Sequence, residues 1–382
     1  MILGSTGRAI LNWVPLADFV ESHNGAVRFG LTFDVSTKDV DLPPLVRERL
    51  GFKYEAGQTR QLDRLVHDVR QWQPTALMLA TIQSPIEVDL SDALSTERTR
   101  PVVIAAQHGF VQRWDRYQRQ TCFDFFLTFG PMFTQPMEDD SRFRTGALPK
   151  LDLIQPRRRR NKTRTALFAP QTHIDPSIKS FLVHLLETHR VLLKPHPAAP
   201  EAYASLVECG LLERCYDRSI DCAMDNVDFV VTTGSTVVLE ALTKATPVVV
   251  LPFQEGRHFD ELGIVLEDYS VERCLKIVDT QEAPQFRDIR HHFLEQATGS
   301  SRNRRSRLAY EAVKRMAADF RQNQVRLGSN RILLSHLLEA VDSDFFLESE
   351  IATLHEKPMQ SKEIIKRAFN RRFSRHREHS QS

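Results

Sequence analysis

The first half of the chain alternates short apolar runs with segments of helical periodicity. Pro101–Ala106 and Asp124–Phe129 are almost continuously apolar, whereas Gln58–Trp72 places an apolar residue at about every third or fourth position. Continuous apolar runs are typical of strands that are buried on both faces of a parallel sheet. The alternation of such strands with helices predicts a doubly wound α/β domain. Two further strands are predicted at Ala26–Phe33 and Thr75–Ile82.

The start of the chain follows the same pattern. Met1–Leu3 predicts a short strand, and the turn Gly4–Gly7 leads into an apolar stripe of helical spacing that extends to about Ser22. Pro15 lies inside this stripe. Because proline cannot donate a backbone hydrogen bond, the sequence predicts a kink or a late helix start there.

The pattern begins again after a polar, basic stretch at residues 155–164, which predicts an interdomain linker. We therefore expect an N-terminal Rossmann-like domain at 1–154, a second one at 165–322, and a helical extension with a basic tail at 323–382. Two such domains would face each other across a cleft. The predicted strands of the second domain are Thr165–Ala169, Val191–Leu193, Val227–Thr232 and Pro247–Leu251, and its predicted helices are Pro176–Glu187, Ser235–Lys244 and Asn303–Phe320.

Length and composition agree with two folded domains. The chain has 382 residues, of which 41% are hydrophobic, and this is enough for two sizeable cores. The formal net charge of +2 argues against a globally basic nucleic-acid binder. No apolar run approaches the ~18–20 residues that span a bilayer, and the first residues do not resemble a signal peptide. The five cysteines lack metal-site spacing. We expect a cytoplasmic protein with no metal site.

The segment that follows the strand Val227–Thr232 is the most informative one. It is the turn Thr233-Gly234-Ser235-Thr236, which stands at the start of a predicted helix. Free N–H groups and the positive end of the helix dipole favour an anion at such a place. The hydroxyls of Ser235 and Thr236 can cap the helix or contact a phosphate, and Glu240 could reach a ribose hydroxyl. The alternative is an ordinary capped turn of an α/β protein.

Two histidines follow other predicted strands. His196 lies in the segment Lys194-Pro195-His196-Pro197, where the two prolines restrict the backbone. His108 lies in the turn Gln107-His108-Gly109, with Gly109 leaving room for a ligand. Histidines placed rigidly at strand ends suit general acid/base catalysis or phosphate contact. Structural histidines satisfied by the backbone are the alternative for both.

The basic tail and two smaller turns carry weaker signals. Residues 356–382 contain eight Lys or Arg against three acidic residues, with Ile365, Phe369 and Phe373 at helical spacing. Such a segment can bind an anionic membrane surface or remain a disordered charged terminus. The turns Gly4–Arg8 and Gly146–Asp152 are further candidates, although both could be plain turns.

Taken together, these motifs resemble those of GT-B-fold transferases of the CDP-glycerol glycerophosphotransferase (teichoic acid polymerase) type and of related capsule glycosyltransferases. The resemblance covers about residues 100–255. In order along the chain, it rests on Gln107-His108-Gly109, Gly146-x-x-Pro-Lys-x-Asp152, Leu192–Pro197, Asp228–Leu242 and Thr246–Val250. The glycerophosphotransferases usually have a Tyr-Ser-Ser type turn where this chain has Thr233–Thr236, so a nucleotide-sugar donor stays open.

This resemblance implies an inverting, metal-independent transferase. It would move a sugar or glycerol-phosphate unit from a CDP- or UDP-linked donor to a hydroxyl of a glycan or lipid-linked acceptor in surface-polysaccharide synthesis, with no cofactor besides the donor and no nucleic-acid partner. The implied catalytic residues are His108, as the base, and His196, as a contact to the donor phosphate. The implied donor-binding residues are Lys194, Thr233, Gly234, Ser235, Thr236 and Glu240, and the candidate acceptor or phosphate contacts are Gly7, Arg8, Gln107 and Gly109.

Two other functions stay open. Gly4–Leu16 resembles the start of UDP-N-acetylglucosamine 2-epimerases, although it has Arg8-Ala9-Ile10 in place of their Arg-Pro-Glu. The chain could also be a non-catalytic scaffold that binds nucleotides or glycans at the inner face of the cell membrane, with the tail as its anchor.

Overall fold

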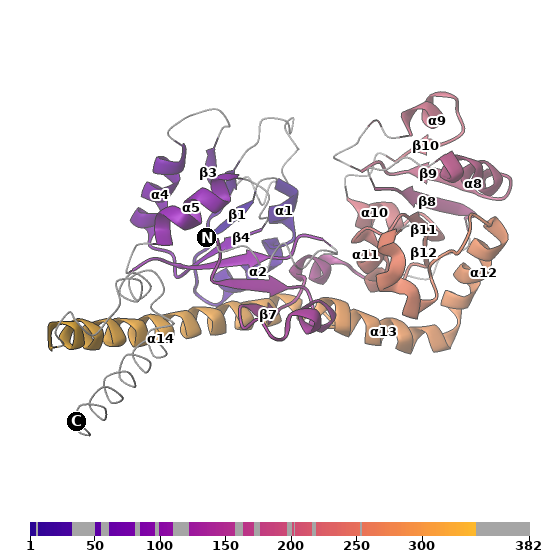
Figure 1. The fold of residues 1–382 in the computed structure, drawn as a ribbon. Helices are drawn as coiled ribbons and strands as arrows, with labels where there is room; N and C mark the ends of the chain where they lie inside the picture. The colour runs from indigo at the N-terminus through magenta and orange to yellow at the C-terminus, as the bar shows by residue number, and fades with distance from the viewer. Residues whose placement is uncertain are drawn as a thin grey trace, which may run out of the picture. The chain divides into compact units, whose positions relative to one another are not determined.

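The computed structural model of the protein describes residues 1–4, 7–32, 50–54, 61–80, 85–95, 99–109, 122–156, 163–171, 176–196, 201, 203–215, 219–252 and 254–340. The chain divides into two compact units, Met1–Lys314 and Arg315–Ser382. The first unit contains two separate parallel sheets (Figure 1). Most of the predicted linker, residues 157–162, and the whole predicted tail, residues 356–382, lie outside the described residues.

The N-terminal sheet has seven parallel strands within the described residues, in the order β3-β2-β1-β4-β5-β6-β7. The strands are β1 (Ile2–Gly4), β2 (Phe29–Thr32), β3 (Leu50–Tyr54), β4 (Ala76–Leu79), β5 (Val102–Ala106), β6 (Phe125–Thr128) and β7 (Phe143–Thr145). The strand order reverses between β1 and β4. In doubly wound sheets, such a switch point is where loops diverge and ligands bind.

Helices flank this sheet, and the predicted helix Gln58–Trp72 is observed as α4. The helices are α1 (Gly7–Leu11), α2 (Val14–Ser22), α4 (Gln61–Trp72), α5 (Pro85–Ser95) and α7 (Pro131–Thr134), with short 3₁₀ turns η1 (Gln135–Met137) and η2 (Pro149–Leu153). Leu65 of α4 and Leu90 of α5 share a buried cluster with Leu3, Leu77 and Val103 of the sheet. Apolar side chains at helical spacing therefore cover apolar strands, as the pattern predicts.

The proline near the chain start acts as expected. Pro15 lies in the first turn of α2, where its missing N–H is harmless. The predicted helix over Gly7–Ser22 is therefore split into α1 and α2, with a break at Asn12 and Trp13. This late start confirms the prediction made from the proline.

The C-terminal sheet has five parallel strands within the described residues, in the order β10-β9-β8-β11-β12. The strands are β8 (Thr165–Ala169), β9 (Arg190–Leu193), β10 (Glu213–Arg214), β11 (Phe229–Thr232) and β12 (Val248–Val250). The flanking helical segments are α8 (Pro176–Leu186), α9 (Ala204–Glu208), α10 (Ile220–Met224), α11 (Val237–Lys244), η3 (Gln254–Leu262), α12 (Val271–Glu282) and α13 (Pro284–Thr298). Phe181 of α8 and Cys274 of α12 pack with Phe168 and Val231 in the core of this sheet.

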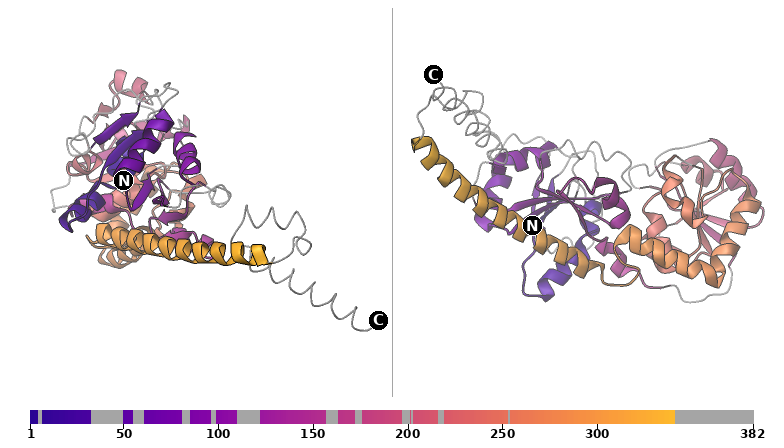
Figure 2. Two further views of the ribbon diagram at one scale, coloured as in Figure 1. Left: turned by 90° about the vertical axis from the view of Figure 1, so that its left-hand side faces the viewer. Right: turned by 60° about the horizontal axis from the view of Figure 1, so that its bottom comes forward.

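A close crossover joins α13 to the N-terminal half of the unit. Gly299 ends α13 with a φ of +75°, a conformation that favours glycine. A Cβ atom on Gly299 would collide with the carbonyl oxygen of Gly146, and one on Gly130 would collide with that of Gln296. Because Gly130 and Gly299 have no side chain, the backbone of each can lie directly against the opposite segment. Helix α14 (Arg305–Ala340) follows as one continuous helix (Figure 2). Every helix of the described part is too short or too polar to cross a bilayer.

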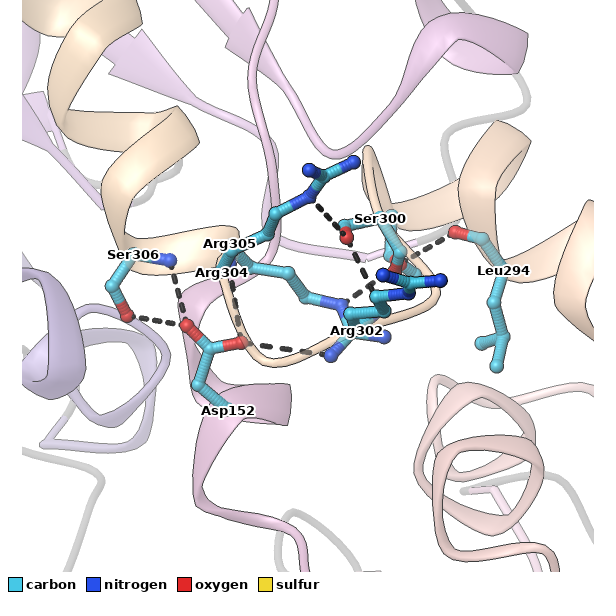
Figure 3. Close-up of polar contacts among 8 residues, drawn as sticks. Asp152, Leu294, Ser300, Arg302, Arg304, Arg305 and Ser306 are labelled. Carbon is cyan, nitrogen blue, oxygen red and sulfur yellow. Dashed lines mark hydrogen bonds and ion pairs between the residues drawn. The ribbon is translucent and has the colours of Figure 1, made fainter.

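Asp152 of η2 fixes the start of α14 (Figure 3). Its carboxylate accepts hydrogen bonds from the backbone N–H of Arg305 (3.2 Å) and from the N–H and hydroxyl of Ser306 (2.8 and 2.7 Å). The Arg305 side chain is fully buried, with Nη1 3.6 Å from Asp152 Oδ1 and Nε donating to Thr298 Oγ1 at 3.0 Å. Burial lowers the pKa of the Arg305 guanidinium to about 10, although the neighbouring Asp152 carboxylate acts to raise it. Asp152 thus caps a helix and offsets a buried charge.

Replacing Asp152 with alanine is expected to lower the free energy of unfolding by about 2–4 kcal/mol. The change removes a helix cap and leaves the buried charge of Arg305 without its counter-ion. Urea denaturation measures the effect. The matched control is Asp139→Ala, because Asp139 is exposed and its change should stay within about 0.5 kcal/mol of wild type. Equal unfolding free energies for the two variants would contradict this role of Asp152.

Candidate functional site

The predicted phosphate-binding turn lies at the switch point of the C-terminal sheet, where β8 and β11 are neighbours. Two hydrogen bonds join the loops that leave these strands: Thr232 Oγ1 donates to the carbonyl of Ala169 (2.7 Å), and the N–H of Gln171 donates to Thr233 Oγ1 (2.8 Å). Thr233 is buried. Its hydroxyl therefore shapes the turn, and the segment after it faces the place where ligands of such sheets bind.

The turn itself leaves backbone donors open. Gly234 has a φ of +92°, which favours glycine at this position. Ser235 Oγ accepts from the N–H of Val237 (3.1 Å), so this hydroxyl caps α11. Within the described residues, the N–H groups of Gly234, Ser235 and Thr236 and the hydroxyl of Thr236 make no hydrogen bond. Three successive N–H groups before a helix form a setting that suits a phosphate.

Glu240 of α11 is engaged by a residue that the sequence analysis did not select. Its Oε1 accepts a hydrogen bond from Lys150 Nζ of η2 at 2.6 Å, and this is also an ion pair. The Glu240 side chain is only 4% exposed, and Oε2 is buried without a hydrogen-bond partner in the described part of the chain. A buried carboxylate oxygen without a partner is costly, so this atom is ready to accept a hydrogen bond from a ligand hydroxyl.

The turn after β5 presents His108 and buries Gln107. The amide of Gln107 donates to the carbonyl of Gly109 (2.8 Å) and accepts from the N–H of Phe129 (2.8 Å). Because both of its amide atoms already bond the backbone, Gln107 holds the turn in shape. His108 is exposed, and its ring makes no hydrogen bond with a described residue.

His108 interacts with the second predicted histidine. Loss of hydration among the surrounding protein atoms lowers its pKa, and the positive charges of Lys150 and His196 lower it further. His196 and Lys194 follow β9 and are half-buried. The two histidines, one from each sheet, therefore lie within electrostatic reach of each other, with Lys150 beside them. A lowered pKa keeps His108 neutral at neutral pH, which is the form that can accept a proton.

The remaining candidates are Gly7, Arg8 and Gly109. Gly7 and Arg8 form the first turn of α1 directly after β1, at the switch point of the N-terminal sheet, but their side chains lie outside the described residues. Gly109 is half-buried in the turn of His108. Within the described part of the chain, no three His, Cys, Asp or Glu side chains gather closely enough to hold a metal ion. Of the functional side chains, sequence reasoning missed Lys150, although the Gly146–Asp152 turn drew attention to its segment.

Two parallel sheets, each in Rossmann strand order and meeting through a crossover helix, define a GT-B-like α/β fold, and this confirms the predicted fold class. Solved structures share it at low sequence identity. The UDP-GlcNAc 2-epimerase of Neisseria meningitidis, bound to UDP-GlcNAc, has a TM-score of 0.57 and 10% identity, with 82% of this chain and 98% of that chain covered. A glycosyltransferase of Rickettsia africae has a TM-score of 0.53 and 12% identity, with 82% and 98% covered.

The wall teichoic acid polymerase TagF, in a structure obtained with CDPG, has a TM-score of 0.50 and 12% identity, with 83% of this chain and 88% of that chain covered. No protein-family model matches the chain, and no curated protein matches it either. The fold is thus one that glycosyltransferases, a teichoic acid polymerase and nucleotide-sugar epimerases share.

The imidazole of His108 is expected to titrate at a lower pH in the folded protein than in the urea-unfolded chain. NMR of the ring Hε1 proton measures both midpoints, with the signal assigned by its loss in His108→Gln. Since the folded pKa is lowered, this group's contribution to stability is present above the unfolded pKa and is lost as the pH falls through the folded pKa. A folded midpoint equal to or above the unfolded one would refute the assigned environment.

Proposed function

We propose that the protein is an inverting, metal-independent GT-B transferase. It would move a sugar or glycerol-phosphate unit from a CDP- or UDP-linked donor to an acceptor hydroxyl. One observation carries the proposal: Lys150 bonds Glu240 on helix α11 and also acts electrostatically on His108. The residue suited to hold a donor ribose and the residue suited to activate an acceptor are therefore neighbours of one lysine.

The donor would be bound mainly by backbone and hydroxyl groups. Its phosphates would accept hydrogen bonds from the open N–H groups of Gly234, Ser235 and Thr236, while Lys194 and His196 would add contacts from the end of β9. A ribose hydroxyl would donate to Glu240 Oε2. Negative charge develops on the departing nucleotide phosphate, and preorganised N–H groups at a helix start can stabilise it.

His108 would act as the base. As the acceptor oxygen attacks the donor carbon or phosphorus atom, its proton passes to a neutral ring nitrogen of His108, and the bond to the nucleotide phosphate breaks. A single displacement of this kind inverts the attacked centre. Proton transfer by a positioned side chain typically contributes 10²–10⁴-fold to the rate.

The biological setting of the proposal comes from the sequence resemblance. We propose surface-polysaccharide synthesis of the capsule or teichoic-acid type, with a glycan or lipid-linked acceptor. The enzyme would be cytoplasmic, with residues 356–382 able to bring it to the inner face of the cell membrane.

A nucleotide-sugar epimerase is the second candidate. A solved UDP-GlcNAc 2-epimerase resembles the chain with a TM-score of 0.57, and this fold likeness favours the alternative. An epimerase needs no acceptor, so an assay with the nucleotide sugar alone distinguishes epimerase activity from transferase activity. A non-catalytic scaffold would bind without turnover.

A nucleotide screen is expected to find a ligand among CMP, CDP, UDP and GDP. A ligand that binds only the native state raises the melting temperature, so thermal shift detects it. Thr236→Val should then raise the dissociation constant of that nucleotide about tenfold, because it removes one hydroxyl contact to a charged phosphate. Calorimetry measures the change. Thr243→Val is the matched control, because Thr243 lies on the same helix and its hydroxyl also lacks a partner in the described part.

If none of the nucleotides shifts the melting temperature, the donor site is wrong. Equal dissociation constants for Thr236→Val and Thr243→Val would remove Thr236 from that site.

His108→Ala is expected to lower turnover by roughly 10²–10⁴-fold while the donor dissociation constant changes less than about twofold, since the ring acts on the acceptor. A radiolabelled donor with a glycan acceptor provides the assay. His292→Ala, at an exposed position of α13, serves as control. Near wild-type turnover in His108→Ala would contradict the role of base. A new epimer formed from UDP-N-acetylglucosamine alone, seen by NMR, would support the epimerase instead.

A further inference from the structure

Lys150 sits on a turn that is fixed at both ends. Its backbone N–H donates to the carbonyl of Asn12, in the break between α1 and α2, at 3.0 Å. Two residues later, Asp152 bonds the first turn of α14. Pro149 precedes Lys150 and restricts the backbone further. The root of the Lys150 side chain is therefore placed by hydrogen bonds to two separate helical segments.

Lys150 is the hydrogen-bond partner of a buried acid, Glu240. The Glu240 side chain is 4% exposed and the Lys150 side chain 32%, so the pair joins a buried carboxylate to a solvent-accessible ammonium group. Removing one member of such a pair leaves an uncompensated charge, which then protonates or reorients. Lys150 thus holds the Glu240 carboxylate in one orientation, with Oε1 hydrogen-bonded and Oε2 buried without a partner in the described part of the chain.

The same ammonium group acts on His108. Among the described residues, the charged groups that act on His108 are Lys150, from η2, and His196, from the segment after β9. Both are cationic when protonated and both disfavour the imidazolium form. Without Lys150, His196 alone of this pair would oppose protonation of His108.

We propose that Lys150 is a positioning residue of the donor site: its 2.6 Å hydrogen bond to Glu240 Oε1 holds the Glu240 carboxylate in place for a ribose hydroxyl. This inference rests on the proposed function, because it takes the ligand of Glu240 to be the ribose of a nucleotide donor. It adds a residue that the donor and base assignments do not contain.

The first test compares CDP and UDP with their 2′,3′-dideoxy analogues. In wild type, loss of the ribose hydroxyls should weaken binding roughly 10-fold or more, as for a hydrogen bond to a charged group. In Lys150→Met, as in Glu240→Gln, the dissociation constant of the dideoxy analogue should exceed that of the parent nucleotide by only about one- to threefold. Lys150→Arg should restore most of the discrimination, because it keeps the charge. The matched control is Lys276→Met, since Lys276 is an exposed lysine of α12.

The second test follows His108 by NMR. Lys150→Met should raise the titration midpoint of the ring, whereas Lys276→Met should leave it at the wild-type value. The acidic limb of the kcat/KM profile should move to higher pH in the same variant. A purely structural lysine would change stability without changing either the ribose ratio or the midpoint, so urea denaturation of each variant completes the set. Lys150→Gln replaces Lys150→Met if the latter does not fold.

The outcomes separate this inference from the proposed function. If wild type binds neither CDP nor UDP, the proposed function fails. If wild type discriminates the ribose hydroxyls and Lys150→Met does so equally well, the role of Lys150 is wrong and the donor site stands. An unchanged midpoint overturns only the electrostatic effect of Lys150 on His108.

Discussion

The short turn η2 is the constraint on which the rest of the first unit depends. Asp152 in this turn accepts three hydrogen bonds from the start of α14 and lies beside the buried guanidinium of Arg305. Lys150, two residues earlier, reaches Glu240 on α11. Hydrogen bonds from these two residues of η2 therefore connect the start of α14, the break between α1 and α2, and helix α11. A buried arginine and a buried glutamate are both costly, and each is compensated by a side chain of this turn.

The candidate site follows from the geometry of parallel sheets. All strands of a parallel sheet end at the same edge, so the loops after β5, β9 and β11 supply residues that are distant in the sequence. In the proposed function, backbone N–H groups would bind the donor phosphates, and side chains would supply the ribose contact and the base. A site of this kind needs few special residues, and the same architecture is found in a nucleotide-sugar epimerase, a glycosyltransferase and a teichoic acid polymerase.

Much of the fold could be predicted from local pattern. The strand Thr165–Ala169 and the split caused by Pro15 match the structure because continuous apolar runs and prolines act locally. The strands β3 (Leu50–Tyr54) and β7 (Phe143–Thr145) were not predicted, because both lie at a sheet edge and neither is a continuous apolar run. Edge strands are not buried on both faces, so they lack the continuous apolar run by which a central strand is recognised in the sequence.

The site could be predicted only in part, for a related reason. Each histidine and the turn at Gly234 follow a recognisable strand, so sequence pattern could nominate them. The pairing of Lys150 with Glu240 joins residues 90 positions apart, and no periodicity encodes it. The hydrogen bond from the N–H of Phe129, just after β6, to Gln107 Oε1 likewise joins residues 22 positions apart. Long-range pairings of polar groups are decided by tertiary packing.

The two glycines at the crossover limit how this architecture can vary. Gly130 and Gly299 bring backbone against backbone, and the smallest added side chain would force the segments apart. The close approach of α13 to the N-terminal half of the unit is therefore possible because these two positions have no side chain, and not because of an attractive contact. In a laboratory evolution experiment, surface loops could drift widely, whereas these two positions would reject every replacement, including alanine.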